Sequence, residues 1–537
     1  MVNGLRSSRP RQGSGVPAGS PTVLQQNLWL TQGMSLTDER TDDEHPAPEL
    51  RDLRRLVDRA VRLTVKAARA DEQPNVARRL RSFLGRLDEA PVVDDSWPIY
   101  DHVNVQRALD AWLAEPGRHA EVMGLAGFQH MEFGLSELLH LGPDFMPVRL
   151  GGLATVNLPS GPDGETLRCI HTGVLLVTEP DGTRLAMLVR SGEMMDRRVH
   201  VQVVCADTTR AEAVAGRLRE LVIERNVFRG RVVSFGDDIF GQESGASLLT
   251  FQTRPHVPRE HLVLPEEVLA QIRRQVLTVA EHRDALRAGG QHLRRGILLY
   301  GPPGTGKTHT IRHLMGLLPD TTVLLISGPA VRFVGEACAI ARNLQPAMVV
   351  VEDVDLIAMD RHMAHEAQPM LFELMNQMDG LAAEADVVFV LTTNRADLLE
   401  QALTTRPGRI DQAVKMEMPD AGARRELLHL YRAELGWEVS DAALDSAVER
   451  SEGTTASFAK ELLRRAALVS LERDPDQVAP TIMDEDLKAG LDELLDSRNR
   501  MTRRALGGEP GGHDETGAAP PEPYPGGWSS AGPGLAP

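Results

Sequence analysis

Apolar residues recur at helical spacing in the first part of the chain, after a polar beginning. Residues 1–48 are rich in Ser, Pro, Gly and acidic residues and predict a disordered segment, in which Met34 is a second candidate start besides Met1. From residue 49 onward, apolar residues recur at intervals of three and four, which predicts two successive helices. The run VNVQRALDAWLAE predicts another, so we expect residues 49–145 to be mostly helical.

The pattern changes to short apolar runs over residues 146–245. Two such runs flank Pro-Asp-Gly at 180–182, which favours a tight turn between two strands, and VHVQVVCAD predicts a buried strand. A long amphipathic helix is expected next, with Thr208 or Thr209 as its cap, followed by a short strand, GRVVSFG. These elements predict a small α+β domain, and we recognise no catalytic motif in it.

Strands and helices alternate over residues 262–419, which predicts a parallel, doubly wound sheet. Helical patterns alone occupy residues 420–504 and predict a separate helical lid. Residues 505–537 are rich in Gly and Pro and predict a second disordered segment. The expected fold class is therefore α/β with a helical lid, preceded by a mixed helical and α+β N-terminal region.

Composition narrows the classes of function. The 537 residues are 42% hydrophobic and 25% charged, which is ordinary for globular protein, and the net charge of −17 argues against a nucleic-acid binder. The three cysteines form no CxxC pair, which argues against a zinc site and favours a reducing, cytoplasmic location. No apolar run approaches the ~18 residues of a membrane span, and no secretory signal is recognisable.

A glycine-rich loop, GPPGTGKT, lies between a predicted strand, GILLY, and a predicted helix, HTIRHLMGLL. This context is typical of a phosphate-binding loop, in which Lys307 reaches the β and γ phosphates of a nucleotide and Thr308 binds Mg²⁺. The alternative, a glycine-rich turn that happens to contain Lys-Thr, is disfavoured by the flanking elements. The residues expected to hold the nucleotide are Gly301, Pro302, Pro303, Gly304, Thr305, Gly306, Lys307, Thr308 and His309.

Polar residues end two further apolar strands. The strand AMVVV ends in Glu352 and Asp353, and VVFVLTT ends in Asn394. An acidic pair at the tip of a buried strand is costly unless it serves a cation or a water. We therefore expect one carboxylate to hold Mg²⁺ and the other to polarise an attacking water that Asn394 orients. The alternatives are a solvated loop acid and a turn asparagine.

With these motifs in order, the stretch from residue 262 to about 500 resembles the ATPase module of the AAA family, within the AAA+ superfamily. RRGILLYGPPGTGKT resembles its Walker A region, QPAMVVVEDVDLIAMDR its Walker B strand, VLTTNRAD its sensor 1 and RPGRIDQAVKMEMPD its second region of homology. The resemblance implies ATP hydrolysis with Mg²⁺ in a ring, usually a hexamer. It makes Arg406 the arginine finger and Arg409 the second arginine, both reaching a neighbour's nucleotide. The alternative for both is surface charge at a helix end.

Three positions depart from the family's pattern. The family has Asp then Glu on the Walker B strand, so the reversed order here gives Glu352 the metal role and the shorter Asp353 the water-activating role. LVLP at 262–265 replaces the family's Asp-x-Gly-Gly, which leaves the adenine contacts open. Thr-Ala-Ser at 455–457 replaces Ser-Gly-Ala of the lid helix and keeps two small residues.

The triplet Phe333-Val334-Gly335 falls where the family has a loop that lines the central pore of its ring. Six such aromatic side chains would grip an extended polypeptide regardless of its sequence. The alternative is that Phe333 is a core residue. Residues 363–369 are a second candidate pore loop, and their His-Glu lacks the second histidine of a zinc protease motif.

The leading hypothesis is a ring-forming ATPase that remodels protein substrates. No protease domain is recognisable after the lid, so we expect remodelling or disassembly rather than degradation by the same chain. The N-terminal region is expected to recruit a substrate or an adaptor. The alternatives are a nucleic-acid motor or loader, and a nucleotide-gated scaffold that pulls nothing.

Overall fold

The computed structural model describes most of the chain between residues 76 and 496. The described ranges are 76–85, 90–126, 133–140, 148–192, 196–236, 248–355, 367–382, 384–395, 410–435, 439–476 and 481–496. The segments 1–48 and 505–537, expected to be disordered, lie outside the described residues, as does most of the second candidate pore loop.

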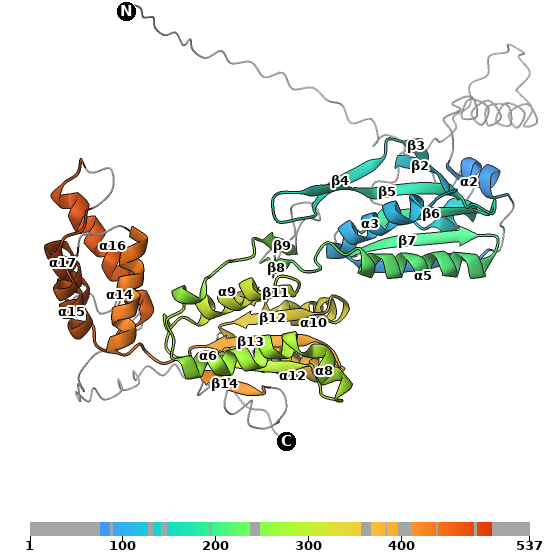
Figure 1. Ribbon diagram of the computed structural model, residues 1–537. Coiled ribbons are helices and arrows are strands. Elements are labelled where there is room, and N and C mark those ends of the chain that lie inside the picture. Colours follow the sequence, from blue (N-terminus) through green and yellow to red (C-terminus); the bar gives the residue numbers. More distant parts are fainter. Residues whose placement is uncertain are drawn as a thin grey trace, which may run out of the picture. The chain divides into compact units, whose positions relative to one another are not determined.

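Seven strands form the sheet of the N-terminal domain (Figure 1). They are β1 (Val93–Pro98), β2 (His119–Ala126), β3 (Arg149–Gly151), β4 (Ala154–Pro159), β5 (Thr166–Thr178), β6 (Arg184–Ser191) and β7 (Arg198–Cys205). The order is β1-β7-β6-β5-β2-β3, β4 also pairs with β5, and every pair is antiparallel. The two strands expected on either side of residues 180–182 are β5 and β6, so that prediction is confirmed.

Helices pack on both faces of this sheet. On one face, α3 (His102–Leu113) and α5 (Thr208–Glu224) share an apolar core with residues such as Leu175. On the other, α2 (Val76–Leu84) and α4 (Leu135–His140) pack with residues such as Val174. Successive strand residues point to opposite faces, so neighbouring positions of β5 contribute to different cores.

The prediction of a mostly helical region over 49–145 is wrong in part: the expected helix VNVQRALDAWLAE is α3, but β1 and β2 also lie in this region and pair with β7 and β5. β1 has the sequence VDDSWP, whose polar residues suit the edge of a sheet and gave no alternating apolar signal. One α+β domain therefore contains α2 to α5. The cap of α5 is Asp207, whose carboxylate accepts the Thr209 N–H, rather than Thr208 or Thr209.

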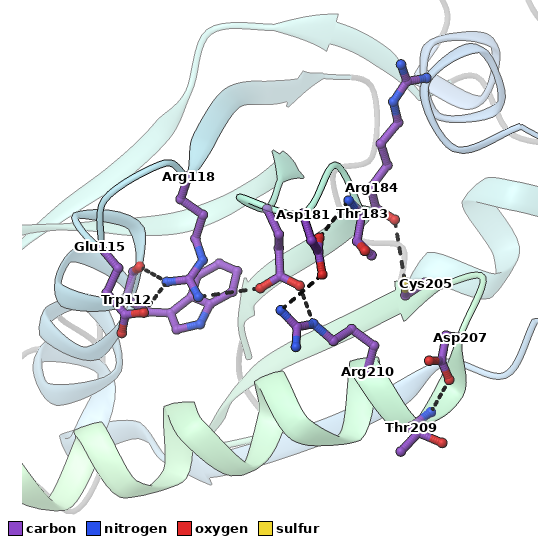
Figure 2. Close-up of polar contacts among 11 residues, drawn as sticks. Trp112, Glu115, Arg118, Asp181, Thr183, Arg184, Cys205, Asp207, Thr209 and Arg210 are labelled. Carbon is purple, nitrogen blue, oxygen red and sulfur yellow. Dashed lines mark hydrogen bonds and ion pairs between the residues drawn. The ribbon is translucent and has the colours of Figure 1, made fainter.

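The β5–β6 turn carries a buried carboxylate held by two arginines. The Glu179 side chain is 1% exposed and accepts hydrogen bonds from Arg118 and Arg210. The Arg118 guanidinium also lies 3.9 Å from the centroid of the Trp112 ring, and Figure 2 shows both arginines converging on this turn. The network joins the region after α3, the β5–β6 turn and α5, which gives it a structural role in the domain.

A second sheet, also of seven strands, carries the candidate phosphate-binding loop. Its strands are β8 (Val232–Phe235), β9 (Leu249–Gln252), β10 (Arg295–Tyr300), β11 (Thr322–Ser327), β12 (Ala347–Glu352), β13 (Val387–Thr393) and β14 (Gln412–Lys415). The order is β14-β10-β13-β12-β11-β8-β9, and all pairs are parallel except β8 with β9. The α/β class with a parallel sheet is confirmed.

Helices cover both faces of the second sheet as well. One face packs against α6 (Glu266–Arg273), the π-helical η3 (Arg274–Thr278) and α9 (Lys307–Leu317). The other packs against α10 (Val334–Asn343) and α12 (Ala367–Asp379). The short α7 (Val279–Glu281) and α8 (Arg283–Ala288) follow η3. Among the described residues, 3₁₀ turns occur here at η2 (Arg259–His261) and η4 (Gly328–Phe333), and in the N-terminal domain at η1 (Ile99–Asp101).

The strand GRVVSFG lies in this second sheet, whereas the sequence placed it in the small α+β domain. β8 pairs with β11, with Val232 opposite Val323, and β9 then forms the edge. The sheet thus begins before residue 262, the expected start of the module. An apolar strand of four residues fits either sheet by its own pattern, so its tertiary partner decides its place.

The four described helices beyond residue 420 form a helical unit. They are α14 (Ala421–Leu435), α15 (Asp441–Arg450), α16 (Ala456–Arg473) and α17 (Asp484–Leu495), and they share one apolar core. This agrees with the helical pattern in the sequence. Within the described residues, no helix has both the length and the apolar character to cross a membrane.

Candidate active site

The glycine-rich loop joins β10 to α9 at the carboxyl end of the parallel sheet. A Cβ on Gly301, whose φ is 150°, would lie 2.1 Å from the Met416 carbonyl oxygen, so only glycine fits there. Gly306 precedes α9 with a left-handed φ of 98°. The Thr305 hydroxyl donates to the Pro302 carbonyl at 2.9 Å. A loop of this shape at a helix N-terminus presents backbone N–H groups to an anion.

Lys307 is folded back onto this loop. Its Nζ donates to the carbonyl oxygens of Gly301 at 2.7 Å and Pro302 at 2.8 Å. Burial lowers the pKa of the Lys307 ammonium to about 8, while the nearby carboxylates of Asp353 and Asp355 oppose that shift. A buried cation whose ammonium contacts carbonyl oxygens can exchange them for phosphate oxygens.

The hydroxyl and the carboxylate expected to bind Mg²⁺ lie side by side. Thr308 Oγ1 donates to Glu352 Oε1 at 2.8 Å, although 44 residues separate them in sequence. Both are hard oxygen donors, which Mg²⁺ prefers, and Mg²⁺ usually completes its shell with phosphates and waters. In the described part of the chain, no cluster of three or more His, Cys, Asp and Glu is arranged to hold a metal. Thr308 and Glu352 therefore fit a metal held jointly with a nucleotide.

The side chains of Asp353 and Asn394, expected to act on the attacking water, also contact each other. Asn394 Nδ2 donates to Asp353 Oδ1 at 3.2 Å, which brings the ends of β12 and β13 together. The Asp355 side chain is buried and accepts from Thr393 Oγ1 at 2.8 Å and from the Asn394 N–H at 3.1 Å. A carboxylate and an amide in contact at the rim of a phosphate loop can hold and deprotonate a water.

A comparison with known families decides what this sheet and loop are. Residues 297–418 match the family model described as "ATPase family associated with various cellular activities (AAA)". The chain contains an AAA ATPase domain. The resemblance inferred from the motifs is thereby confirmed.

Similar proteins share the AAA domain over part of their length. The chain is 27% identical over 266 residues to the proteasome-activating nucleotidase of Methanocaldococcus jannaschii, covering 47% of this chain and 60% of that protein. It is 32% identical over 227 residues to the ATP-dependent zinc metalloprotease FtsH 2 of Symbiobacterium thermophilum, covering 39% of this chain and 38% of that protein. It is 33% identical over 216 residues to the 26S proteasome regulatory subunit 6B homolog of Aspergillus niger, covering 36% of this chain and 49% of that protein. The chain thus covers less than two thirds of each of these relatives.

The start of α16 lies against the phosphate loop of the AAA domain. The Ser457 N–H donates to the Gly304 carbonyl at 3.3 Å. A Cβ on Gly304, whose φ is 80°, would lie 2.8 Å from the hydroxyl oxygens of both Thr455 and Ser457. The segment 455–457, which departs from the family's pattern, therefore contacts the loop through its small side chains and its backbone.

A segment between β9 and α6 runs along the phosphate-loop helix α9. Arg254 donates to four carbonyl oxygens, those of Met315, Leu318, Gly230 and Thr321, at 2.7–3.1 Å. His313 and His309 bind the carbonyl oxygens of Val257 and His261 at 2.7 and 3.0 Å.

His309, expected near the nucleotide, is thus held by this segment. Sequence reasoning missed Arg254, because its acceptors lie 24 to 67 residues away in the chain and no local motif marks them.

The candidate pore triplet lies at the junction of η4 and α10. Phe333 is half-buried and stacks on Phe235, and the Arg332 guanidinium lies 4.6 Å from the Phe333 ring centroid. Val334 is 2% exposed and Gly335 is half-buried. In this conformation the aromatic side chain packs on its own domain, and its role in a pore stays a prediction.

Arg406 and Arg409 lie outside the described residues, so their roles also remain predictions. Of the other expected site residues, the structure brings Lys307, Thr308, Glu352, Asp353 and Asn394 to one edge of the sheet.

Proposed function

We propose that this chain hydrolyses ATP in an oligomeric ring and uses the energy to remodel, unfold or disassemble protein substrates. One observation carries the proposal: Lys307, the Thr308–Glu352 pair and the Asp353–Asn394 pair gather at the carboxyl edge of one parallel sheet. This edge is where open α/β sheets bind their ligands.

Each of these side chains has a distinct part in the reaction. Bound ATP and Mg²⁺ would supply the bond to be broken and most of the charge neutralisation. Lys307 would exchange its two carbonyl acceptors for phosphate oxygens, and Thr308 and Glu352 would hold the metal. Asp353 would accept a proton from the attacking water that Asn394 helps to orient.

The ring rests on the family resemblance. Arg406 and Arg409 fall on the family's intersubunit arginines, so a complete site would need a neighbouring copy, most simply in a hexamer. The names of two similar proteins, a proteasome-activating nucleotidase and a proteasome regulatory subunit, favour protein over nucleic acid as substrate. We propose that the N-terminal α+β domain recruits that substrate or its adaptor, in the cytoplasm.

The ATPase and the ring are tested together. Purified chain should turn over ATP at a rate per protomer that rises with protein concentration as rings form, which mass photometry would count. Lys307→Ala should lose nucleotide binding or turnover, and Arg406→Ala should bind ATP but not hydrolyse it. A single chain that hydrolyses ATP at the full rate would contradict the ring.

Remodelling is tested separately with an unfolded model polypeptide and with Phe333→Ala. A threading machine should lose remodelling in this variant while its basal ATPase remains. A nucleotide-gated scaffold should be indifferent to the substitution. A salt-sensitive rise in ATPase rate on adding DNA would instead favour a nucleic-acid motor.

A further inference from the structure

The backbone of Asp353 is left-handed, with a φ of 52°. It is the one non-glycine residue with positive φ in the part of the chain that the structure describes. This conformation costs most residues about 1–2 kcal/mol, whereas Asp and Asn tolerate it better because their short side chains bond locally. Strain of this kind persists where the surrounding structure holds it, and it clusters at functional sites.

The side chain that holds Asp353 is Thr392. Its Oγ1 accepts the Asp353 N–H at 3.0 Å, and Thr392 itself is 2% exposed. The backbone ladder between β12 and β13 ends at Val351 and Leu391, which lie two residues before Asp353 and one residue before Thr392. On its other side, β13 continues to pair with β10, with Thr392 opposite Leu299. The Thr392 hydroxyl therefore accepts a backbone N–H just beyond the point where the β12–β13 backbone pairing ends.

The turn at Asp353 brings its carboxylate to Asn394. Thr392, Thr393 and Asn394 follow one another at the end of β13, and each binds the acidic run after β12: Thr392 holds the Asp353 backbone, Thr393 holds the Asp355 carboxylate, and Asn394 contacts the Asp353 carboxylate. The position of the proton acceptor therefore depends on a backbone bond that no sequence motif marks.

We propose that Thr392 is a positioning residue for ATP hydrolysis, which fixes the left-handed turn of Asp353 and so sets the reach of its carboxylate. The inference rests on the proposed ATPase function. It also accounts for aspartate at this position, because glutamate would gain one methylene at the cost of a less favourable backbone. Without the Thr392 hydroxyl, the Asp353 N–H loses its partner and the carboxylate is no longer held against Asn394.

Thr392→Val tests this, because it keeps the shape of the side chain and removes the acceptor. Thr392→Ser restores the hydroxyl, and Thr172→Val changes an equally buried strand threonine in the N-terminal domain. The first measurement uses nucleotide-free protein and hydrogen–deuterium exchange mass spectrometry of a peptide covering residues 350–355. We expect one additional fast-exchanging amide in Thr392→Val and wild-type exchange in the other two variants.

The second measurement is ATP binding and turnover by the same proteins. We expect Thr392→Val to lower kcat about tenfold, since a small misplacement of a reacting group has effects of this size, with ATP affinity within twofold of wild type. Thr392→Ser should recover most of the rate. If Thr392→Val does not fold, Thr392→Ala is used in its place in both measurements, because it removes the same acceptor.

Three results would overturn the inference: unchanged exchange in Thr392→Val, a kcat within twofold of wild type, or a Thr392→Ser variant as impaired as Thr392→Val, which would mean a packing role. A wild-type protein without ATP turnover would instead remove the proposed function. The exchange experiment would then still decide whether Thr392 holds Asp353, because it uses no nucleotide.

Discussion

The ring of Phe333 stacks on the ring of Phe235, with their centroids 5.7 Å apart and their planes 17° apart. Phe235 is the last residue of β8, which pairs with β11 in the second sheet. Phe333 is the last residue of η4, the 3₁₀ turn that follows β11. The aromatic residue expected to grip a substrate therefore packs on a strand of its own sheet.

We expect the two rings to be energetically coupled. Phe235→Leu and Phe333→Leu each remove one ring, and their double-mutant cycle should give a coupling of about 0.5–1.5 kcal/mol, as for other aromatic pairs. Urea unfolding of the four proteins measures it. Phe251→Leu is the control, because Phe251 pairs with Phe228 instead. Additive effects of the two substitutions would mean that the stacking contributes nothing.

The pKa of Lys307 predicts how ATP binding depends on pH. Burial lowers this pKa to about 8, so free protein loses the ammonium as pH rises above 8, whereas phosphate contacts favour the charged form. ATP affinity should therefore fall above pH 8, and binding should take up a proton there. Calorimetry at pH 8.5 in buffers of different ionisation enthalpy measures this uptake.

The same shift affects stability with a definite sign. The Lys307 pKa is lower in the folded chain than in the unfolded chain, so the unfolded chain binds more protons between about pH 8 and the ordinary lysine value. The Lys307 contribution to stability should rise with pH across that window. Lys307→Met, which carries no charge, should lack this pH-dependent contribution in urea unfolding, and an identical pH profile in both proteins would argue against it.

Much of the AAA domain was predictable because its functional residues lie in short, contiguous sequence motifs. The phosphate loop, the apolar strands and their polar ends follow in order, and parallel strands bring those ends together. The N-terminal domain was less predictable, because β1 is a polar edge strand and β8 joins a sheet formed by later residues. The hold of Thr392 on Asp353 spans 39 residues and depends on a backbone turn, which leaves no pattern in the sequence.

Asp353 itself allows a sharp test of the reversed acidic order. Asp353→Asn keeps a residue type suited to the left-handed backbone and removes the proton acceptor, so it should bind ATP, hydrolyse it slowly and stabilise the ring. Rapid hydrolysis by this variant would show that another group accepts the proton. Radiolabelled ATP turnover and mass photometry measure the two effects.

Asp353→Glu separates side-chain length from backbone conformation. If length alone mattered, restoring the family's glutamate would raise the rate. We expect instead a lower kcat and a stability loss of about 1 kcal/mol, because glutamate is less suited to a φ of 52°. Steady-state kinetics measures the change in kcat, and urea unfolding measures the change in stability. A faster enzyme of unchanged stability would contradict the backbone argument.

Arg254 links the segment before the AAA domain to the far end of the phosphate-loop helix. Its two terminal nitrogens each donate to two carbonyls, around the end of α9 and beside β8. Lysine keeps the charge but has one nitrogen and cannot reproduce this fork, so Arg254→Lys should take a donor from part-buried carbonyls such as those of Gly230 and Thr321 and lower stability by about 1–3 kcal/mol. Because Lys307 and Thr308 begin α9, a loosened helix should also weaken ATP binding. Arg274→Lys, an exposed arginine on η3, is the matched control, and equal effects of the two substitutions in thermal unfolding and nucleotide titration would remove Arg254 from this role.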